Sequence, residues 1–233
     1  MSDEHLVLAG GGHTHALILR RWTMKPHLKP QGLITLINRH STTLYSGMIP
    51  GLIGGYYKLH QVKIDLRSLT QKAGIAFVLG DINGLNILSN SVDLRDRSPV
   101  YFQRLSLDVG SETYQSSLSN QTKTSDLIVP IKPFHRAISW IEKQDNDAYK
   151  INQEPFTVVG SGLSAVEIVL ALRQRWDMRP LQLQADLSKL NPKFNQALFQ
   201  SRINLVSTEE YICGPALLCT GNKGPNWLAK SQL

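Results

Sequence analysis

The chain has 233 residues, of which 42% are hydrophobic and 18% are charged. A chain of this length can bury a large core, fits one large domain or two small ones, and has apolar runs too short to span a bilayer. The formal net charge is +7, but the basic residues are scattered, which argues against a nucleic-acid partner. Two cysteines make no disulfide framework, and the acidic start is unlike a signal peptide, so we expect a cytoplasmic protein without a transmembrane segment.

The first part of the chain has the pattern of a strand, a helix and a second strand. Residues 6–9 predict a short buried strand, residues 16–22 a helix, and residues 33–37 a second strand. Three consecutive glycines, Gly10 to Gly12, separate the first strand from the helix. This order and length are typical of one βαβ unit.

The middle of the chain has a different pattern. A glycine- and aromatic-rich loop covers 41–57, and we expect Asp65 to cap the short helix that follows it. A third strand is predicted at 76–79, and the alternation from 81 to 109 predicts an antiparallel meander. Residues 111–126 are rich in Ser, Thr and Gln and predict a mobile loop.

The first pattern then recurs. A helix is predicted after Pro133, followed by a strand at 156–159, a second glycine turn, a helix at 163–175 and a strand at 181–184. We therefore predict an α/β fold with two Rossmann-like dinucleotide-binding modules and an intervening β-meander. The predicted modules are residues 1–150 and a shortened second module, residues 151–233.

The first turn, Gly10-Gly11-Gly12, fits the start of G-x-G-x-x-G. In this motif the glycines allow a tight turn and close approach to a diphosphate, which the N–H groups of the helix N-terminus bind. The sixth position is His15, which either loosens the helix–strand contact or places an imidazole beside it. The second strand ends in Asn38 and Arg39 rather than the usual acid, so ribose would meet an uncharged amide. The alternative is a glycine-rich turn without a ligand.

The second turn matches the motif better. Gly160, Gly162 and Ala165 give G-x-G-x-x-A, and Glu167 follows two residues later. Asp186, one residue late after the next strand, is a candidate for the ribose acid. No Arg stands there to meet a 2′-phosphate, which favours NADH over NADPH.

Two other patterns raise metal or redox alternatives. His13 and His15 lack nearby Cys or carboxylate partners and make a poor zinc site, so we expect packing or phosphate-side roles and no metal. Cys213 and Cys219 are compatible with a redox dithiol or half a metal site, but Cys219 lies in a predicted strand and is better explained as an inert core thiol.

In combination, these motifs resemble the pyridine nucleotide–disulfide oxidoreductase superfamily, in the branch of type II NADH dehydrogenases and sulfide:quinone reductases. Five segments are most similar to the NADH-dehydrogenase-like module that some bacteria fuse to selenide, water dikinase: GGGHTHALILRRW, LYSGMIPGLIGGYY, IDLRSL, LSLDVGS and VVGSGLSAVEIVLALRQR. The resemblance runs from about residue 5 to the end of the chain, with a gap near 205–215.

The resemblance implies FAD on the first module and NAD(P)H, with NADH favoured, on the second. Hydride then passes from NADH to the flavin and on to an unidentified small-molecule acceptor, with no catalytic acid or base of the protein. The residues implied for FAD are Gly10, Gly11, Gly12, His13, His15, Asn38, Arg39, Tyr45, Pro50, Asp108 and Gly110. Those implied for the nicotinamide cofactor are Gly160, Gly162, Leu163 and Glu167.

The chain also departs from this family. Residues 44–57 contain no cysteine pair, which excludes a thiol relay, and the segment that closes the flavin site after the second module is missing. We therefore expect the isolated chain to be a weak catalyst that a further segment, a selenide, water dikinase-like domain or a subunit completes. Peripheral membrane association is expected only in a full-length relative.

Two alternatives remain open. The first is a truncated dinucleotide-binding module without activity, acting as a partner or remnant. The second, a methyltransferase using the first turn, is disfavoured by the second glycine turn.

Overall fold

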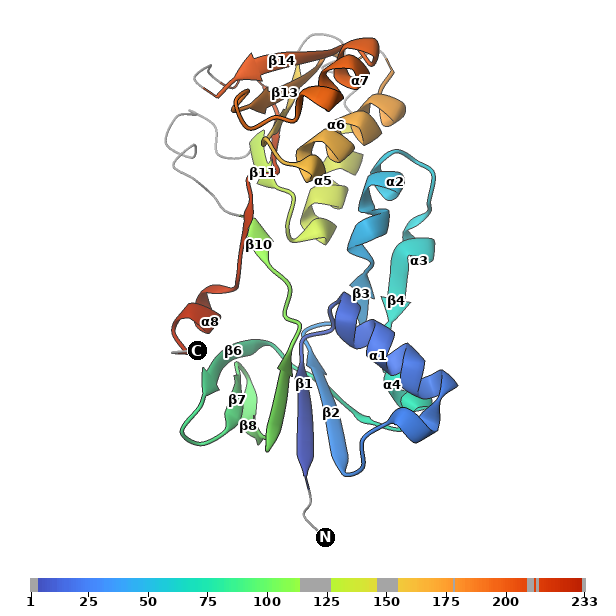
Figure 1. Cartoon of the computed structure of the whole chain (residues 1–233), viewed down its shortest axis with the longest axis vertical. Helices are drawn as coiled ribbons and strands as arrows, with labels where there is room; N and C mark the ends of the chain where they lie inside the picture. Colours follow the sequence, from blue (N-terminus) through green and yellow to red (C-terminus); the bar gives the residue numbers. More distant parts are fainter. Residues whose placement is uncertain are drawn as a thin grey trace. The chain divides into compact units, whose positions relative to one another are not determined.

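The computed structural model describes residues 4–113, 127–145, 155–177, 179–208, 212 and 214–231. The chain forms two compact units (Figure 1): the first contains residues 1–46, 63–111 and 224–233, and the second contains residues 47–62 and 112–223. The units therefore differ from the predicted division at residue 150. The reason is packing, because the segment 47–62 and the helix after Pro133 lie with the second module.

The first unit is built on a parallel sheet in the order β5-β2-β1-β9. The predicted βαβ unit is confirmed, because α1 (His13–Met24) connects β1 (His5–Ala9) to β2 (Leu33–Asn38). Alternate side chains serve the two faces of the sheet. Leu8 and Leu36 pack in a cluster with residues of α1 and α4 (Leu66–Ala73), whereas Val7 and Ile37 pack on the opposite face.

Residues 82–101 form the predicted antiparallel meander, with strands β6 (Ile82–Asn86), β7 (Ser91–Leu94) and β8 (Arg97–Tyr101). The prediction that the meander extends to residue 109 is wrong, because β9 (Arg104–Leu107) pairs in parallel with β1. Alternation marks a strand but does not say which neighbour it pairs with. The short helix α8 (Asn226–Ala229) belongs to this unit, and its Trp227 packs against the meander cluster.

Smaller elements complete the first unit. The strands β3 (Thr42–Leu44) and β4 (Lys63–Asp65) pair antiparallel, and β5 (Ala76–Leu79) follows α4. The predicted cap of α4 is confirmed, because the Asp65 carboxylate accepts a hydrogen bond from the N–H of Ser68 at 3.0 Å.

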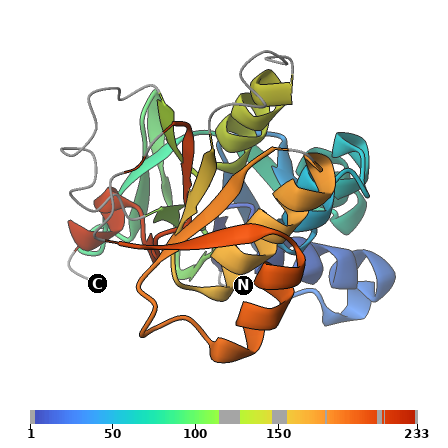
Figure 2. The same cartoon turned by 90° about the horizontal axis from the view of Figure 1, so that it is seen from above.

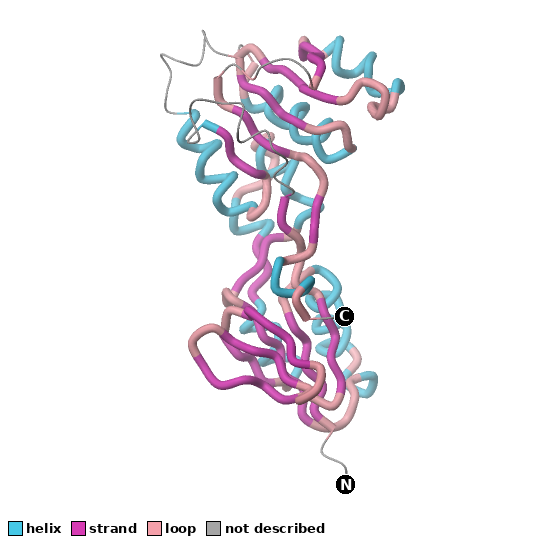
Figure 3. The backbone as a smooth tube through the Cα atoms, turned by 90° about the vertical axis from the view of Figure 1, so that its left-hand side faces the viewer, coloured by secondary structure: helices cyan, strands magenta, loops and turns pink. Residues whose placement is uncertain are grey.

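The second unit contains a five-stranded parallel sheet in the order β11-β15-β12-β13-β14 (Figures 2 and 3). The strand β12 (Phe156–Val159) is buried along its whole length, as expected of a central parallel strand. The helix α6 (Leu163–Arg175) connects β12 to β13, as predicted. The other strands of the sheet are β11 (Ile128–Pro130), β13 (Leu181–Ala185), β14 (Ile203–Ser207) and β15 (Ala216–Leu218). The helices α5 (Phe134–Asp145) and α7 (Asn195–Gln200) belong to the same unit.

Two predicted loops contain regular structure. The 41–57 loop includes α2 (Ile49–Ile53), which packs on α6, and α3 (Leu59–Val62) follows it. In the predicted mobile loop, β10 (Glu112–Thr113) pairs with β16 (Asn222–Lys223), while residues 114–126 lie outside the described residues. Within the described part of the chain, no helix is both long and apolar enough to cross a membrane.

Candidate functional site: two glycine turns

The first glycine turn lies at the carboxyl end of β1, where the chain order of the sheet reverses between β2 and β9. Ligands of open α/β sheets bind at this kind of position. Gly10 has a φ of +93°, and a Cβ there would lie 2.2 Å from the carbonyl oxygen of Asp108. Only glycine therefore fits at this position, because β9 approaches the turn closely.

Asp108 contacts the turn through both its backbone and its side chain. Its carbonyl accepts a hydrogen bond from the N–H of Gly12 at 3.1 Å, and its carboxylate accepts one from the N–H of His15 at 2.9 Å. A Cβ on Gly12 would lie 2.1 Å from the Asp108 carboxylate. A negative group of the protein itself thus lies at the N-terminus of α1, where the helix dipole stabilises anions.

His15 is fully buried, and both of its ring nitrogens meet protein atoms. Nδ1 lies 2.6 Å from the carbonyl oxygen of Gly10, and Nε2 lies 2.9 Å from Oγ of Ser106. The sequence left two alternatives for His15, a looser helix–strand contact or an imidazole beside that contact, and the structure shows the second. Through these two contacts its ring links the turn to β9.

Asn38 and Arg39 are also paired within the protein. The Asn38 side-chain oxygen accepts a hydrogen bond from the N–H of Gly11, and its amide donates to the carbonyl of His40, both at 2.8 Å. Exposed Arg39 forms an ion pair with Asp81 at 2.7 Å. Contacts of these two side chains to FAD stay a prediction.

The other residues expected around FAD are His13, Tyr45, Gly110 and Pro50. The ring of His13, the residue directly after the first turn, stacks on the ring of Tyr45, with their centroids 4.7 Å apart. Gly110 is exposed, with a φ of +73°. Pro50 belongs to the other compact unit, in the first turn of α2.

The second glycine turn differs from the first at its second glycine. Gly12 is covered by the Asp108 carboxylate, whereas no described residue covers Gly162. Gly160 packs as Gly10 does, since a Cβ there would lie 2.6 Å from the carbonyl oxygen of Cys219. Among the described residues, none would lie within 4 Å of a Cβ on Gly162, and none caps α6 with its side chain. Leu163 is 57% exposed, and Glu167 is exposed as well.

Asp186 follows β13, the strand after the second turn. Its backbone N–H donates to Oγ of Ser161 at 2.8 Å, which ties it to the turn. Hydrogen bonds from Lys189 and Ser188 lower the pKa of the Asp186 carboxyl to about 2. The ion pair with Lys189, at 2.8 Å, is not apparent from the sequence motif, although the spacing of three residues is a signal that could have revealed it.

The two turns differ in how well they fit a dinucleotide. At the second turn, the open face of Gly162 and the uncapped helix leave room and N–H donors for a diphosphate, with Asp186 available for ribose. At the first turn the fit is partial, because the Asp108 carboxylate takes the N–H of His15 and covers Gly12.

The structure also bears on the thiol and metal alternatives. Burial raises the pKa of the Cys219 thiol to about 12, so it is an inert core thiol, as predicted. Cys213 lies outside the described residues. Within the described ranges, no three His, Cys, Asp or Glu side chains gather as a metal site would require.

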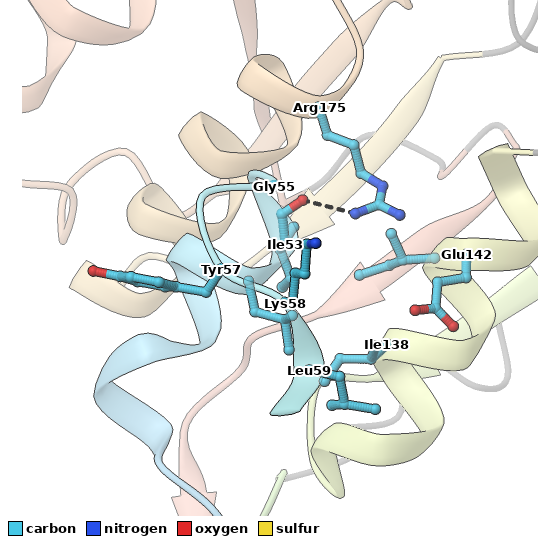
Figure 4. Close-up of a pocket in the computed structure, with 10 residues that line it drawn as sticks. Ile53, Gly55, Tyr57, Lys58, Leu59, Ile138, Glu142 and Arg175 are labelled. Atoms are coloured by element: carbon cyan, nitrogen blue, oxygen red, sulfur yellow. Dashed lines mark hydrogen bonds between the residues drawn. The ribbon is translucent and has the colours of Figure 1, made fainter. Parts of the chain in front are cut away.

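A separate pocket of about 300 Å³ lies within the second unit (Figure 4). Its wall is mainly apolar, and the Arg175 guanidinium at its edge donates to the carbonyl of Ile53 at 3.0 Å. Figure 4 shows the Tyr57 ring directed away from Ile138 and Glu142. Arg175 and Gly162 stand at opposite ends of α6, about 20 Å apart, so this pocket is separate from the second glycine turn.

No protein-family model matches the chain, and no curated protein does. Among solved structures, it is similar to reduced Bacillus anthracis CoADR-RHD, with a TM-score of 0.78 and 16% identity, covering 99% of this chain and 46% of that one. NDH2 from Plasmodium falciparum in complex with NADH has a TM-score of 0.74 and 12% identity, covering 98% and 57%. The sulfide:quinone oxidoreductase from Aquifex aeolicus has a TM-score of 0.73 and 15% identity, and the match covers 98% of this chain and 61% of that one.

The chain has the FAD/NAD(P)-binding fold. The predicted fold class is therefore confirmed, with two parallel-sheet modules and an intervening meander. In these comparisons the chain spans about half of the similar structures, from 46% to 61% of their length.

Proposed function

We propose that this chain is the nucleotide-binding part of an NAD(P)H-dependent flavin oxidoreductase. The observation that carries the proposal is the second glycine turn. The open Gly162 stands at an uncapped helix N-terminus, and Asp186 follows the neighbouring strand. The solved complex of the similar NDH2 with NADH supports a nicotinamide dinucleotide there.

The residues assigned to this ligand are Gly160, Gly162, Leu163 and Asp186. The N–H groups at the start of α6 would bind the diphosphate, and the Asp186 carboxylate would accept hydrogen bonds from ribose hydroxyls. A carboxylate at that position disfavours a 2′-phosphate, so we propose NADH rather than NADPH. Flavin, when bound, supplies a two-electron acceptor for the nicotinamide hydride, and the protein's part is to position the two.

We further propose a small-molecule electron acceptor, and a further domain or subunit that completes the flavin site. A selenide, water dikinase-like domain is the candidate that the sequence resemblance favours. The non-catalytic alternative, a module that binds one nucleotide, is favoured by one observation. Asn38 and Asp108 at the first turn are both engaged with the protein's own backbone.

Calorimetric titration of the purified chain with NADH and NADPH tests the proposal. We expect NADH to bind more tightly, and Gly162→Val to abolish binding because the side chain fills the open face of the turn. The absorption spectrum with added FAD, before and after anaerobic NADH, separates the two functions. Bleaching of the flavin by NADH supports the oxidoreductase. Binding of NADH without any FAD binding, weak binding included, supports the non-catalytic alternative, and binding of neither NADH nor FAD contradicts both.

A further inference from the structure

The two glycine turns share a backbone plan but differ in the group at the helix N-terminus. Gly10 packs on the carbonyl of Asp108, and Gly160 packs in the same way on the carbonyl of Cys219. Asp108, the residue after β9, and Cys219, the residue after β15, thus have equivalent positions in the fold. One carries a carboxylate, which points onto Gly12 and accepts the N–H of His15, whereas Cys219 carries a buried thiol and leaves Gly162 open.

The carboxylate uses part of the donor set that a diphosphate needs. Gly11 donates to Asn38, Gly12 to the Asp108 carbonyl, and His15 to the Asp108 carboxylate. Among the described residues, only the N–H groups of His13 and Thr14 at this helix start have no acceptor. A diphosphate bound to these two groups would lie within one helical turn of the carboxylate, and like charges at that spacing repel each other.

We propose that Asp108 sets the nucleotide affinity of the first glycine turn, by holding a carboxylate where a dinucleotide diphosphate has to bind. The inference rests on the proposed function, since it concerns the site assigned there to FAD. It gives Asp108 the opposite role to the favourable flavin contact that the family resemblance implies. A consequence is that the chain fills its second site before its first.

The test uses Asp108→Asn, because an amide oxygen can still accept the His15 N–H while the charge is removed. Asp93→Asn is the matched control, since it removes the same charge from the meander of the same unit. Both substitutions are made in the Gly162→Val chain, so that only the first turn is measured. FAD and ADP are titrated by flavin fluorescence and calorimetry at low and high salt.

We expect Asp108→Asn to bind FAD and ADP about tenfold more tightly than its parent at low salt, with a smaller difference at high salt because salt screens the repulsion. Asp93→Asn should bind like the parent. Asp108→Ser, which also keeps a neutral acceptor, replaces Asp108→Asn if the latter fails to fold.

Equal or weaker binding by the Asp108 variants, with measurable binding by the parent, overturns this inference and leaves the proposed function standing. If none of these chains binds FAD or ADP, the inference is overturned, and so is the flavin part of the proposed function. NADH binding at the second turn, which Gly162→Val removes from all of these chains, is tested separately with the intact chain. A tenfold gain that is also seen in Asp93→Asn overturns the inference too, because it assigns the effect to net charge.

Discussion

The side-chain oxygen of Asn38 accepts a hydrogen bond from the N–H of Gly11 at 2.8 Å, while its amide donates to the carbonyl of His40. The residue expected to meet a ribose therefore supports the glycine turn itself. A backbone N–H in a tight turn has few other partners, which explains why an amide, with one acceptor and two donor hydrogens, suits this position.

Asn38→Ala should lower the free energy of unfolding by about 2 kcal/mol, because two hydrogen bonds are lost at about 1 kcal/mol each. Asn38→Asp keeps the acceptor for Gly11 but places an oxygen against the His40 carbonyl, so we expect a loss of about 1 kcal/mol. Urea denaturation measures both. Arg39→Ala, which removes an exposed ion pair, is the control and should cost less than 1 kcal/mol. An unchanged unfolding midpoint in Asn38→Ala would show that the turn does not depend on this side chain.

His15→Ala should lower the free energy of unfolding by about 3 kcal/mol, because it leaves a cavity and removes the hydrogen-bond partner of a buried carbonyl and of the partly buried Ser106 hydroxyl. A double-mutant cycle with Ser106→Ala should give a coupling energy of about 1 kcal/mol. His13→Ala, on an exposed neighbour in the same helix turn, is the control. Equal effects of the two histidine substitutions would contradict the role of His15 as a link between the turn and β9.

Gly12→Ala and Gly162→Ala should differ although the motif treats them alike. The new methyl group at residue 12 displaces the Asp108 carboxylate from the helix N-terminus, which should cost about 1–2 kcal/mol of stability. The methyl group at residue 162 meets no atom of the described part of the chain within 4 Å, and the extended backbone conformation there suits alanine, so stability should be unchanged. Thermal unfolding of both variants without ligand measures this, and equal midpoints would contradict the difference between the turns.

The Asp145 carboxylate accepts hydrogen bonds from Arg175 and from Nε1 of Trp176. Burial works to raise the pKa of Asp145, but these hydrogen bonds outweigh it and lower the pKa below its ordinary value. A lowered pKa in the folded state adds stability above the unfolded-state pKa of about 4, and this stability is lost as the pH falls through the folded value.

We therefore expect Asp145→Asn to cost about 2 kcal/mol at neutral pH, and the difference from the parent chain to shrink below about pH 4. Urea denaturation from about pH 3 to about pH 7 measures this. Asp93→Asn, which makes the same change of charge in the other compact unit, is the control. A difference that stays constant across this range would contradict the ion pair as its cause.

Cys219 should resist alkylation in the folded chain. With a pKa of about 12 and a buried side chain, it has almost no accessible thiolate at neutral pH. In a Cys213→Ser variant, mass spectrometry after iodoacetamide treatment should find no label in buffer and full labelling in denaturant. Rapid labelling of the folded chain would show that the end of β15 opens readily.

Much of the fold follows from local sequence signals. Both βαβ units, the Asp65 cap and the meander have patterns that neighbouring residues determine, such as the continuous apolar strand 156–159 before its glycine turn. The partner of β9 could not be predicted, because pairing direction depends on tertiary packing. The contact of the Asp108 carboxylate with the first turn could not be predicted either, since Asp108 lies 93 residues from His15 and no short motif joins them.

The path of the chain has a consequence for its synthesis. The chain passes between the two units four times, and the first unit regains residues 224–233 only at the end. Trp227 packs on the cluster formed by Leu85, Val92 and Leu94. During synthesis, these three residues leave the ribosome well before Trp227, because residues 112–223 of the second unit are translated in between. Until Trp227 is made, part of the apolar face of the meander stays exposed. Exposed apolar surface of this kind favours aggregation, so we expect chaperones to bind the nascent first unit.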